Sequence, residues 1–406
     1  MDEKDILNFK VLAGSDPIKI LKAKPFKIFE EEVLLLLSEI SNKILNNERQ
    51  FKNKEDFIGF GFWARKANLK RLKIKRKNNN DLRIGRGPIL HIAPSNITAN
   101  ALFTFAFGLI SGCPSIIRIS SRILGEYDYI FDVITKISQS KIFVNSFSRF
   151  SFISYDVDSN LNEFFCKKVK ARVIWGGNHT IEKFKCFNTS PNCIDLIFPN
   201  RDSSSIISTS WLNSSSEKEL KKISDLYARD VGLYSQQACS SPRSLIVLKD
   251  DNSNTKEKLR NFLYFCDKSL NHKKGVSSSQ GLLNLKTSID IFIKNPSLKL
   301  FFKGTNLCVF SLAQNEASIK KDIFLKDSCL ILYETNLIDD VTKFLRKDNQ
   351  TLICIGLSED SKKEIAFKAA LDGTDRVVEA GNALSMDIFW DGYDIVNFLS
   401  RIIIIN

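Results

Sequence analysis

The strongest constraint on the fold of this sequence is a regular alternation of short apolar runs with helix-patterned segments. Apolar runs at residues 88–93, 115–119 and 171–175 have the length of single strands, and helical spacing or a helix-opening glycine follows each of them. Strands and helices in alternation are typical of a mainly parallel sheet with helices on both faces, so the sequence predicts an α/β fold. Further strands are expected at 150–155, 193–198, 244–249, 307–312, 351–357 and 402–405, and helices at 29–47, 56–72, 126–139, 161–169, 217–230 and 254–270.

The length of 406 residues suffices for two domains with separate cores. A polar patch at residues 208–219 is the expected crossing into the second domain, where the alternation continues. The charge-free stretch between Arg86 and Arg118 is long enough to cross a membrane, but Pro94, Gly112 and Pro114 interrupt it. It is therefore expected to form a strand, a buried helix and a second strand, and no transmembrane segment is predicted.

Charge and cysteine content narrow the functional classes. The net charge is +13, and residues 65–86 form the most basic stretch. Because aromatic residues are not interleaved with these charges, a solvated helix face is favoured over a nucleic-acid patch, and a third use is attraction of a polyanionic substrate such as a CoA thioester. Nine cysteines without paired spacing and without a secretory leader indicate a reducing, cytoplasmic location. With three histidines and no C-x-x-C pair, no metal site is predicted.

Cys239 differs from the other eight cysteines in its surroundings. Small polar residues flank it in the run 236–242, directly before the apolar run 245–248. A thiol on a short loop between packed elements can be exposed and activated. Most of the other cysteines stand in apolar runs, as Cys354 does, and are expected to be small core residues. Cys239 is thus the candidate nucleophile, and the alternative is one more packed cysteine.

Three further positions could serve a thioester or a nucleotide. Asn96 follows a strand and precedes a helix, where its amide could donate to a developing oxyanion or simply cap the helix. Arg118 stands in an apolar strand, where a guanidinium can meet a nucleotide phosphate or form a structural ion pair. Trp175, Gly176 and Gly177 end a strand and open a helix, which suits a pyrophosphate, although a plain tight turn explains them equally well.

In their order along the chain these features resemble the aldehyde dehydrogenase superfamily, and within it the LuxC-type acyl-CoA reductases, the long-chain fatty-acyl reductases known from bacterial luminescence. Residues 94–96 are similar to the superfamily's Pro-x-Asn turn, and 237–242 resemble the reductase pattern around the nucleophile. The resemblance spans most of the chain. It is also carried by residues 85–92, 115–118, 171–177, 198–203, 375–378 and 390–394.

The resemblance implies two Rossmann-like α/β lobes. These are a cofactor-binding lobe at residues 1–206, with a returning segment at about 372–406, and a catalytic lobe at 207–371 that carries Cys239. It implies NADPH-dependent reduction of an acyl thioester through a Cys239 acyl-enzyme. Asn96 would bind the thioester oxygen, Arg118 the adenosine ribose with its 2′-phosphate, and residues 175–177 would lie under the cofactor.

The superfamily's ribose-binding glutamate is not evident, and two further departures from ordinary aldehyde dehydrogenases accompany the resemblance. Residues 198–203 contain no glutamate, so the base that activates water in those enzymes is missing, which suits a thioester reductase. Gln236 stands where dehydrogenases often have glycine. Neither departure identifies the acyl chain.

Other functions and partners stay open. A cysteine acyltransferase would use Cys239 without a nicotinamide cofactor, and a basic non-enzymatic binding protein would not need Cys239 at all. The acyl donor is expected to be acyl-CoA or an acyl-carrier thioester, and an acyl-transfer protein could be a partner. A homo-oligomer, dimer or larger, is expected from the resemblance, and no nucleic-acid partner is.

Overall fold

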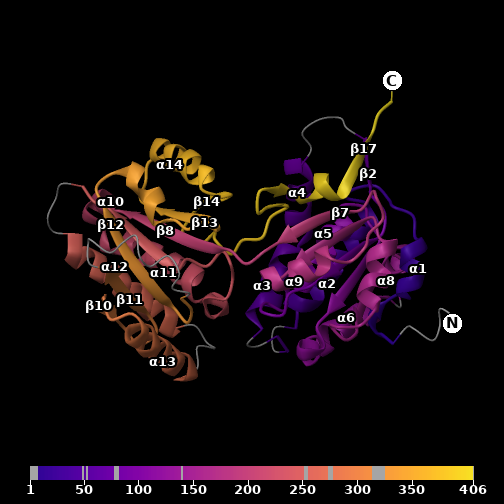
Figure 1. The fold of residues 1–406 in the computed structure, drawn as a ribbon, viewed down its shortest axis with the longest axis horizontal. Helices are drawn as coiled ribbons and strands as arrows, with labels where there is room; N and C mark the ends of the chain where they lie inside the picture. Colours follow the sequence, from indigo (N-terminus) through magenta and orange to yellow (C-terminus); the bar gives the residue numbers. More distant parts are fainter. Residues whose placement is uncertain are drawn as a thin grey trace. The chain divides into compact units, whose positions relative to one another are not determined.

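A computed structural model describes residues 8–47, 50–51, 54–76, 82–138, 140–250, 255–272, 278–312 and 325–405 (Figure 1). The chain divides into two compact units. One comprises Met1–Asn200 with Met386–Asn406, and the other comprises Arg201–Ser385. The first expected lobe boundary, at 206, lies a few residues after this limit, because β8, Asp202–Ser208, belongs wholly to the second unit. The second, at about 372, lies well before Met386, because β14, Arg376–Glu379, also belongs to the second unit.

The first unit contains a six-stranded sheet in the order β1-β5-β4-β3-β6-β7. Its strands are β1 Lys10–Gly14, β3 Ile89–Ile92, β4 Ser115–Ile119, β5 Phe150–Ser154, β6 Ala171–Trp175 and β7 Ile194–Phe198. Only β1 is antiparallel to its neighbour. The strand β3 comes first among the parallel strands, and the chain then proceeds outward on both sides of it. The strand order therefore reverses between β3 and β6, the position where doubly wound sheets bind ligands.

Helices cover both faces of this sheet, as the alternation predicted. Along β4, Ile117 packs into the core that α2 and α5 share, whereas Ile116 packs into the core of α8 and α9. Successive strand residues point to opposite faces, so a fully apolar strand needs a helical layer on each side. The helices of this unit are α1 Pro17–Lys22, α2 Glu31–Leu45, α3 Glu55–Trp63, α4 Lys66–Arg76, α5 Asn100–Ile110, α6 Asp128–Ser138, α7 Val144–Phe147, α8 Leu161–Lys168, α9 Asn178–Lys185 and α15 Ile395–Leu399.

The single helix predicted at residues 56–72 is wrong, because two helices, α3 and α4, occupy this region. Trp63 is buried against Phe60 and Phe103 at the end of α3. The Asn68 amide donates to the Trp63 carbonyl at 2.7 Å and so satisfies one of the carbonyl groups that a helix end leaves open. Helical periodicity runs through such a break, so the sequence pattern could not reveal it.

The basic helix α4 buries Leu69 and Leu72, and its cations meet acidic residues of the returning C-terminal segment. Lys75 lies 2.7 Å from Asp387, and Arg76 lies 3.6 Å from Asp394. Residues 77–81, in the middle of the basic stretch, lie outside the described residues. These two ion pairs give Lys75 and Arg76 of α4 a structural role within the first unit.

The returning segment pairs with the amino-terminal part of the same unit. The strand β17, Ser400–Ile403, is antiparallel to β2, Leu82–Gly85. The terminal strand expected at 402–405 therefore begins two residues earlier. A short hairpin, β15 Phe389–Trp390 with β16 Tyr393–Asp394, precedes it.

The second unit contains a seven-stranded sheet in the order β10-β11-β12-β9-β8-β13-β14. The edge strand β10 is antiparallel to β11, and all other pairs are parallel. Its strands are β8 Asp202–Ser208, β9 Ser244–Leu248, β10 Leu298–Lys303, β11 Cys308–Leu312, β12 Cys329–Thr335, β13 Asn349–Ile355 and β14 Arg376–Glu379. Its helices are α10 Thr209–Ser214, α11 Glu217–Gly232, α12 Thr255–His272, α13 Ser278–Lys294 and α14 Glu359–Leu371.

No helix among the described residues is long and apolar enough to cross a membrane. The charge-free stretch contains α5, a buried helix of 11 residues between two strands, as its proline and glycine breaks predicted.

Candidate active site

Cys239 lies in a tight turn that the rest of the second unit holds in place. The Ser241 N–H donates to the Ala238 carbonyl at 3.1 Å and closes the turn. The Ser203 hydroxyl, at the start of β8, donates to the Cys239 carbonyl at 2.7 Å and accepts from the Thr351 N–H at 3.2 Å. The backbone of the turn is thus fixed to the amino ends of β8 and β13.

Exposure separates Cys239 from most of the other thiols. Six cysteines are buried, Cys186 is exposed, and Cys193 and Cys239 are partly exposed. Burial raises the pKa of Cys113 to about 11 and that of Cys354 to about 12, so these thiols stay protonated and unreactive near neutral pH. Cys239 combines solvent access with an anchored backbone, which are two requirements of a nucleophile.

Gln236 also holds the loop through hydrogen bonds of its own. Its buried amide donates to the Pro242 carbonyl at 2.7 Å and to the Cys329 carbonyl at 3.0 Å, and it accepts from the Cys329 N–H at 3.2 Å. The backbone carbonyl of Gln236 accepts from the Arg243 guanidinium at 3.1 Å. The Gln236 side chain therefore joins both ends of the loop to β12, a role that the sequence did not suggest.

The backbone before Cys239 is strained. Tyr234, Ser235 and Gln236 have φ angles of 57°, 50° and 62°, in the left-handed region that favours glycine. Non-glycine residues persist there only where surrounding contacts enforce the conformation. Three of them in succession show that the structure around the loop determines its course.

Asp202 is the only carboxylate in residues 198–203, and its two oxygens face guanidinium groups. Arg243 lies 3.0 Å from one oxygen and Arg346 lies 3.6 Å from the other. Burial raises the pKa of Asp202, and the two arginines oppose this effect. The one carboxylate of residues 198–203 is thus held in structural ion pairs.

Asn96 lies in the loop between β3 and α5 with an exposed side chain. Its carbonyl oxygen accepts from the Ile97 N–H at 3.0 Å. The helix α5 begins at Asn100 with Ala99 as its N-cap, so Asn96 does not cap this helix. The loop is anchored elsewhere, because Asp56 accepts from the Ala99 N–H at 2.8 Å and the Tyr127 hydroxyl donates to the Thr98 carbonyl at 2.6 Å.

Arg118 ends the apolar part of β4 and is 7% exposed. It donates to the Tyr155 carbonyl at 3.2 Å, and its guanidinium carbon lies 5.4 Å from the centre of the Tyr155 ring. In the described part of the chain its Nε has no hydrogen-bond partner. Burial lowers the pKa of Arg118. A buried guanidinium with an unsatisfied donor is poised to receive an anionic group.

The glycine turn after β6 leads directly into α9. Trp175 stacks on Phe198 with ring centres 3.9 Å apart, and Gly177 is the N-cap residue of α9. A Cβ on Gly177 would lie 3.1 Å from the Asn200 amide. A Cβ on Gly176 would likewise lie 3.0 Å from the Thr180 side chain, so both glycines fit a crowded turn.

Asn96, Arg118 and residues 175–177 all belong to the carboxyl ends of neighbouring parallel strands β3, β4 and β6 in the first unit. Cys239 belongs to the second unit, at the amino ends of β8 and β9. The roles assigned to these residues stay predictions. No sequence pattern pointed to Ser203, Asp56 or the Asp202–Arg243 pair, because their partners are distant along the chain.

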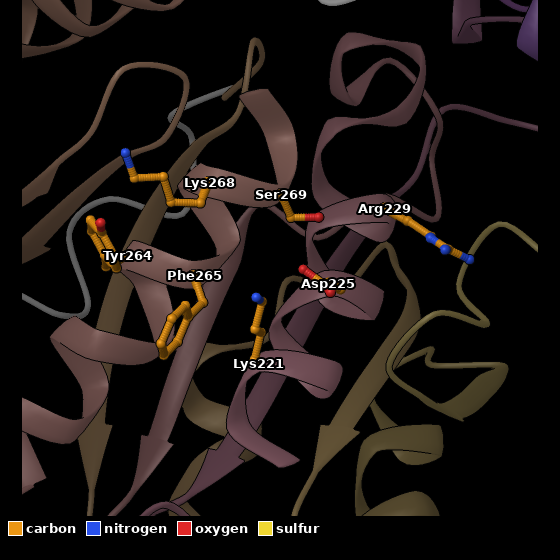
Figure 2. Close-up of a pocket in the computed structure, with 7 residues that line it drawn as sticks. All are labelled: Lys221, Asp225, Arg229, Tyr264, Phe265, Lys268 and Ser269. Atoms are coloured by element: carbon orange, nitrogen blue, oxygen red, sulfur yellow. The ribbon is translucent and has the colours of Figure 1, made fainter. Parts of the chain in front are cut away.

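A surface groove of about 430 Å³ lies between α11 and α12 (Figure 2). It contains none of the predicted site residues. Its lining residues are Lys221, Asp225, Arg229, Tyr264, Phe265, Lys268 and Ser269. Among the described residues no cluster of histidine, cysteine, aspartate and glutamate could hold a metal ion.

Solved structures give the fold family. A salicylaldehyde dehydrogenase from Pseudomonas putida G7, solved with salicylaldehyde, matches with a TM-score of 0.61 and 12% identity over 95% of this chain and 87% of that chain. An aldehyde dehydrogenase from Mycobacterium tuberculosis, solved with NAD+, matches with a TM-score of 0.61 and 8% identity over 92% and 85% of the two chains.

Proline utilization A from Corynebacterium freiburgense matches with a TM-score of 0.66 and 11% identity over 96% of this chain and 43% of that chain. This chain spans 39% of the proline utilization A of Bradyrhizobium japonicum. At these identities the matches show the aldehyde dehydrogenase fold alone.

A search of curated proteins finds no match. The family model for acyl-CoA reductase (LuxC) matches residues 64–402, which is most of the sequence. With the aldehyde dehydrogenase fold and this match, the chain belongs to the LuxC acyl-CoA reductase family.

Proposed function

We propose that the protein reduces an acyl thioester to an aldehyde with NADPH, by way of an acyl-enzyme on Cys239. Family membership supports acyl-CoA as the substrate class. The observation that carries the proposal is the partly exposed Cys239 thiol on an anchored loop. The Ser203 hydroxyl donates to the Cys239 backbone carbonyl at 2.7 Å and holds this loop in place. A nucleophile has to be accessible and correctly oriented, and this loop provides both.

The first step forms a bond between the Cys239 sulfur and the thioester carbon. The carbonyl oxygen becomes an oxyanion, which collapses and expels the CoA thiolate to leave the acyl-enzyme. By resemblance to the superfamily, the Cys239 backbone N–H and the Asn96 amide stabilise this oxyanion. The exposed side chain of Asn96, on a loop that Asp56 and Tyr127 anchor, supports this role.

The first unit has the features of a dinucleotide site. The strand order reverses between β3 and β6, and the glycines after β6 let a backbone approach the pyrophosphate at the start of α9. Arg118 lies one residue before the end of β4, the second parallel strand of the fold, near the place where doubly wound proteins put the residue that recognises the ribose. Its unsatisfied Nε fits the 2′-phosphate of NADPH. When bound, NADPH supplies the hydride that reduces the acyl-enzyme.

The surroundings of Asp202 support reduction over hydrolysis. Hydrolysis of an acyl-enzyme needs a base that can take a proton from water. The one carboxylate of residues 198–203 faces two arginines, which hold it in ion pairs. The acyl group on Cys239 is therefore expected to persist until hydride arrives.

The test is a steady-state assay with acyl-CoAs of increasing chain length. We expect one aldehyde and one free CoA thiol for each NADPH consumed, and no turnover by Cys239→Ser. Arg118→Ala should raise the KM for NADPH at least about tenfold, because a charge-assisted hydrogen bond is lost, and change that for NADH little. Transfer of the acyl group without NADPH binding would replace the proposal with the acyltransferase alternative.

A further inference from the structure

The helix α13 lies at the periphery of the second unit (Figure 1), and most of its large apolar side chains are exposed, whereas Ile291 is buried. Leu282, Leu285, Ile289, Phe292 and Ile293 are 68%, 45%, 49%, 48% and 69% exposed. The first four are three, four and three residues apart, which is the spacing along the seam of a two-helix coiled coil, and Ile293 directly follows the fourth. We call these five side chains the α13 stripe.

The inner face of α13 buries Ile291 together with several polar side chains, and the contacts of these polar groups fix the orientation of the helix. The buried Asn284 donates to the Asp327 carbonyl at 2.6 Å and accepts from Lys303 at 2.6 Å. The buried Thr287 hydroxyl donates to the Asp327 carboxylate at 2.7 Å. Rotating α13 to bury the stripe would leave these polar groups without partners in the core, which is costly. The buried polar contacts of Asn284 and Thr287 therefore keep the stripe on the outer face of α13.

An exposed stripe of this size needs a partner. Five large side chains at these exposures amount to apolar area on the order of 500 Å², the upper end of what a monomer leaves exposed. Two copies packed stripe to stripe would bury about 1,000 Å² in total, which reaches the lower limit of a specific protein interface. The area alone thus meets the requirement of a self-association surface.

The charges beside the stripe favour an antiparallel pair. Lys286 and Asp290 are both exposed and lie four residues apart on the same flank of the stripe. A two-fold axis through the middle of the stripe, near residue 288, places each Lys286 next to the Asp290 of the other copy. An interfacial membrane helix would instead keep a solvated, Lys- and Arg-rich polar face, whereas the polar face of α13 is buried in its own unit.

From these observations we infer that the α13 stripe is a contact between two copies of this chain, with the two helices antiparallel about a two-fold axis. The resemblance to the superfamily implies an oligomer but assigns no surface to it. The inference does not depend on the reductase activity, because α13 contains none of the residues placed in that mechanism.

The experiment is sedimentation velocity on the full chain at concentrations on the order of micromolar. The parent should have the mass of a dimer or a multiple of it. Leu285→Glu combined with Ile289→Glu should halve this mass and weaken association at least about a hundredfold, because two unpaired charges would be buried in each copy's contact. The matched control is Phe367→Glu with Leu371→Glu on α14, whose side chains are 78% and 80% exposed, and it should keep the parent mass.

Charge reversal tests the antiparallel arrangement separately. Lys286→Glu or Asp290→Lys alone should weaken association about tenfold, since each places like charges together twice in the pair. The double reversal should restore most of the parent affinity. A monomeric parent, an unchanged mass after the α13 substitutions, or a double reversal weaker than both single ones would overturn the inference. A monomer that binds neutral phospholipid vesicles through Leu285 would overturn it in favour of a membrane.

Discussion

At the scale of single residues, Cys239, Asn96 and Arg118 have different surroundings, and these decide how each can act. The thiol has solvent access and a fixed backbone, the amide is exposed on an anchored loop, and the guanidinium is buried with one donor unsatisfied. A nucleophile and an oxyanion donor must reach the substrate, whereas a phosphate receptor gains strength from burial. The three environments agree with the three proposed roles.

Asn96→Ala should slow aldehyde formation about a hundredfold or more, because removing one oxyanion donor costs about 2.7–4 kcal/mol of transition-state stabilisation. The loss should appear in kcat with little change in the KM for acyl-CoA, as measured by steady-state kinetics. Ser95→Ala is the matched control, since Ser95 is the exposed neighbour on the same loop. Normal turnover by Asn96→Ala would remove this residue from the mechanism.

Substitutions at Gln236 separate the hydrogen bonds of this side chain from its backbone strain. Gln236→Ala deprives three buried backbone groups of a partner and should lower the free energy of unfolding by at least about 2 kcal/mol. Gln236→Gly loses the same bonds but relieves the φ of 62°, so it should be about 1 kcal/mol more stable than the alanine variant. Urea denaturation measures both values, and Gln237→Ala, at the exposed neighbour, is the control. An alanine variant as stable as the glycine variant would contradict the strain.

The sequence could single out Cys239 because its polar neighbours differ from the apolar runs around most of the other thiols. It could not reveal the contacts that fix the loop. Gln236 bonds Cys329, 93 positions away along the chain, and Ser203 bonds Cys239, 36 positions away. Pairing over such separations is decided by the sheet order, which no local pattern encodes.

At the scale of elements, β3 and α5 pack so closely that a histidine between them stays neutral. The His91 ring nitrogens lie 2.7 Å from the Thr104 hydroxyl and 3.2 Å from the Ser115 hydroxyl, and the residue is fully buried. A Cβ on Gly108 of α5 would lie 2.8 Å from the imidazole, so glycine is required there. Burial lowers the pKa of His91 from 6.5 to about 3.

This shift predicts a loss of stability in acid. Below about pH 6.5 the unfolded chain protonates His91 and the folded chain does not, so the unfolded state binds more protons. The contribution of neutral His91 to the free energy of unfolding is fully present above the unfolded pKa of 6.5. It falls as the pH drops toward about 3, at a rate approaching 1.4 kcal/mol per pH unit. Urea unfolding at about pH 7 and about pH 5 should show a smaller drop for His91→Gln than for the parent. The exposed His179→Gln should behave like the parent, and equal drops in all three proteins would contradict the shift.

Several apolar strands were predicted, although the buried apolar strand β12 was not, and a strand stabilised by polar contacts was also missed. The strands β3, β4 and β6 are fully buried and apolar or nearly so, which the periodicity captured. The strand β8 contains Ser203, Ser204 and Ser205 and was not predicted. Its hydroxyls find partners inside the fold, since Ser205 bonds Tyr227 at 2.7 Å and the Ser244 carbonyl at 2.8 Å. A serine run has the composition of a loop until such partners are known.

At the scale of the whole molecule, two units with separate cores carry separate parts of the proposed chemistry. The candidate cofactor residues all belong to the first unit, and Cys239 with its supporting contacts belongs to the second. The α/β class and a division into two could be predicted because the alternation continues through both halves. The polar patch at 208–219 did not reveal the division at Arg201, because α10 and the start of α11 occupy it. The first unit passes into the second within a few residues of β7, so no linker composition marks the boundary.

The central claim is that an acyl group is transferred to the Cys239 sulfur before any hydride is transferred. Intact-protein mass spectrometry after mixing with acyl-CoA, without NADPH, tests it most directly. The mass should rise by one acyl group in the parent, in Cys186→Ser and in Cys193→Ser, and not in Cys239→Ser, and added NADPH should release the group as aldehyde. An acyl group on another residue, or NADPH consumption by a protein that is never acylated, would contradict the account.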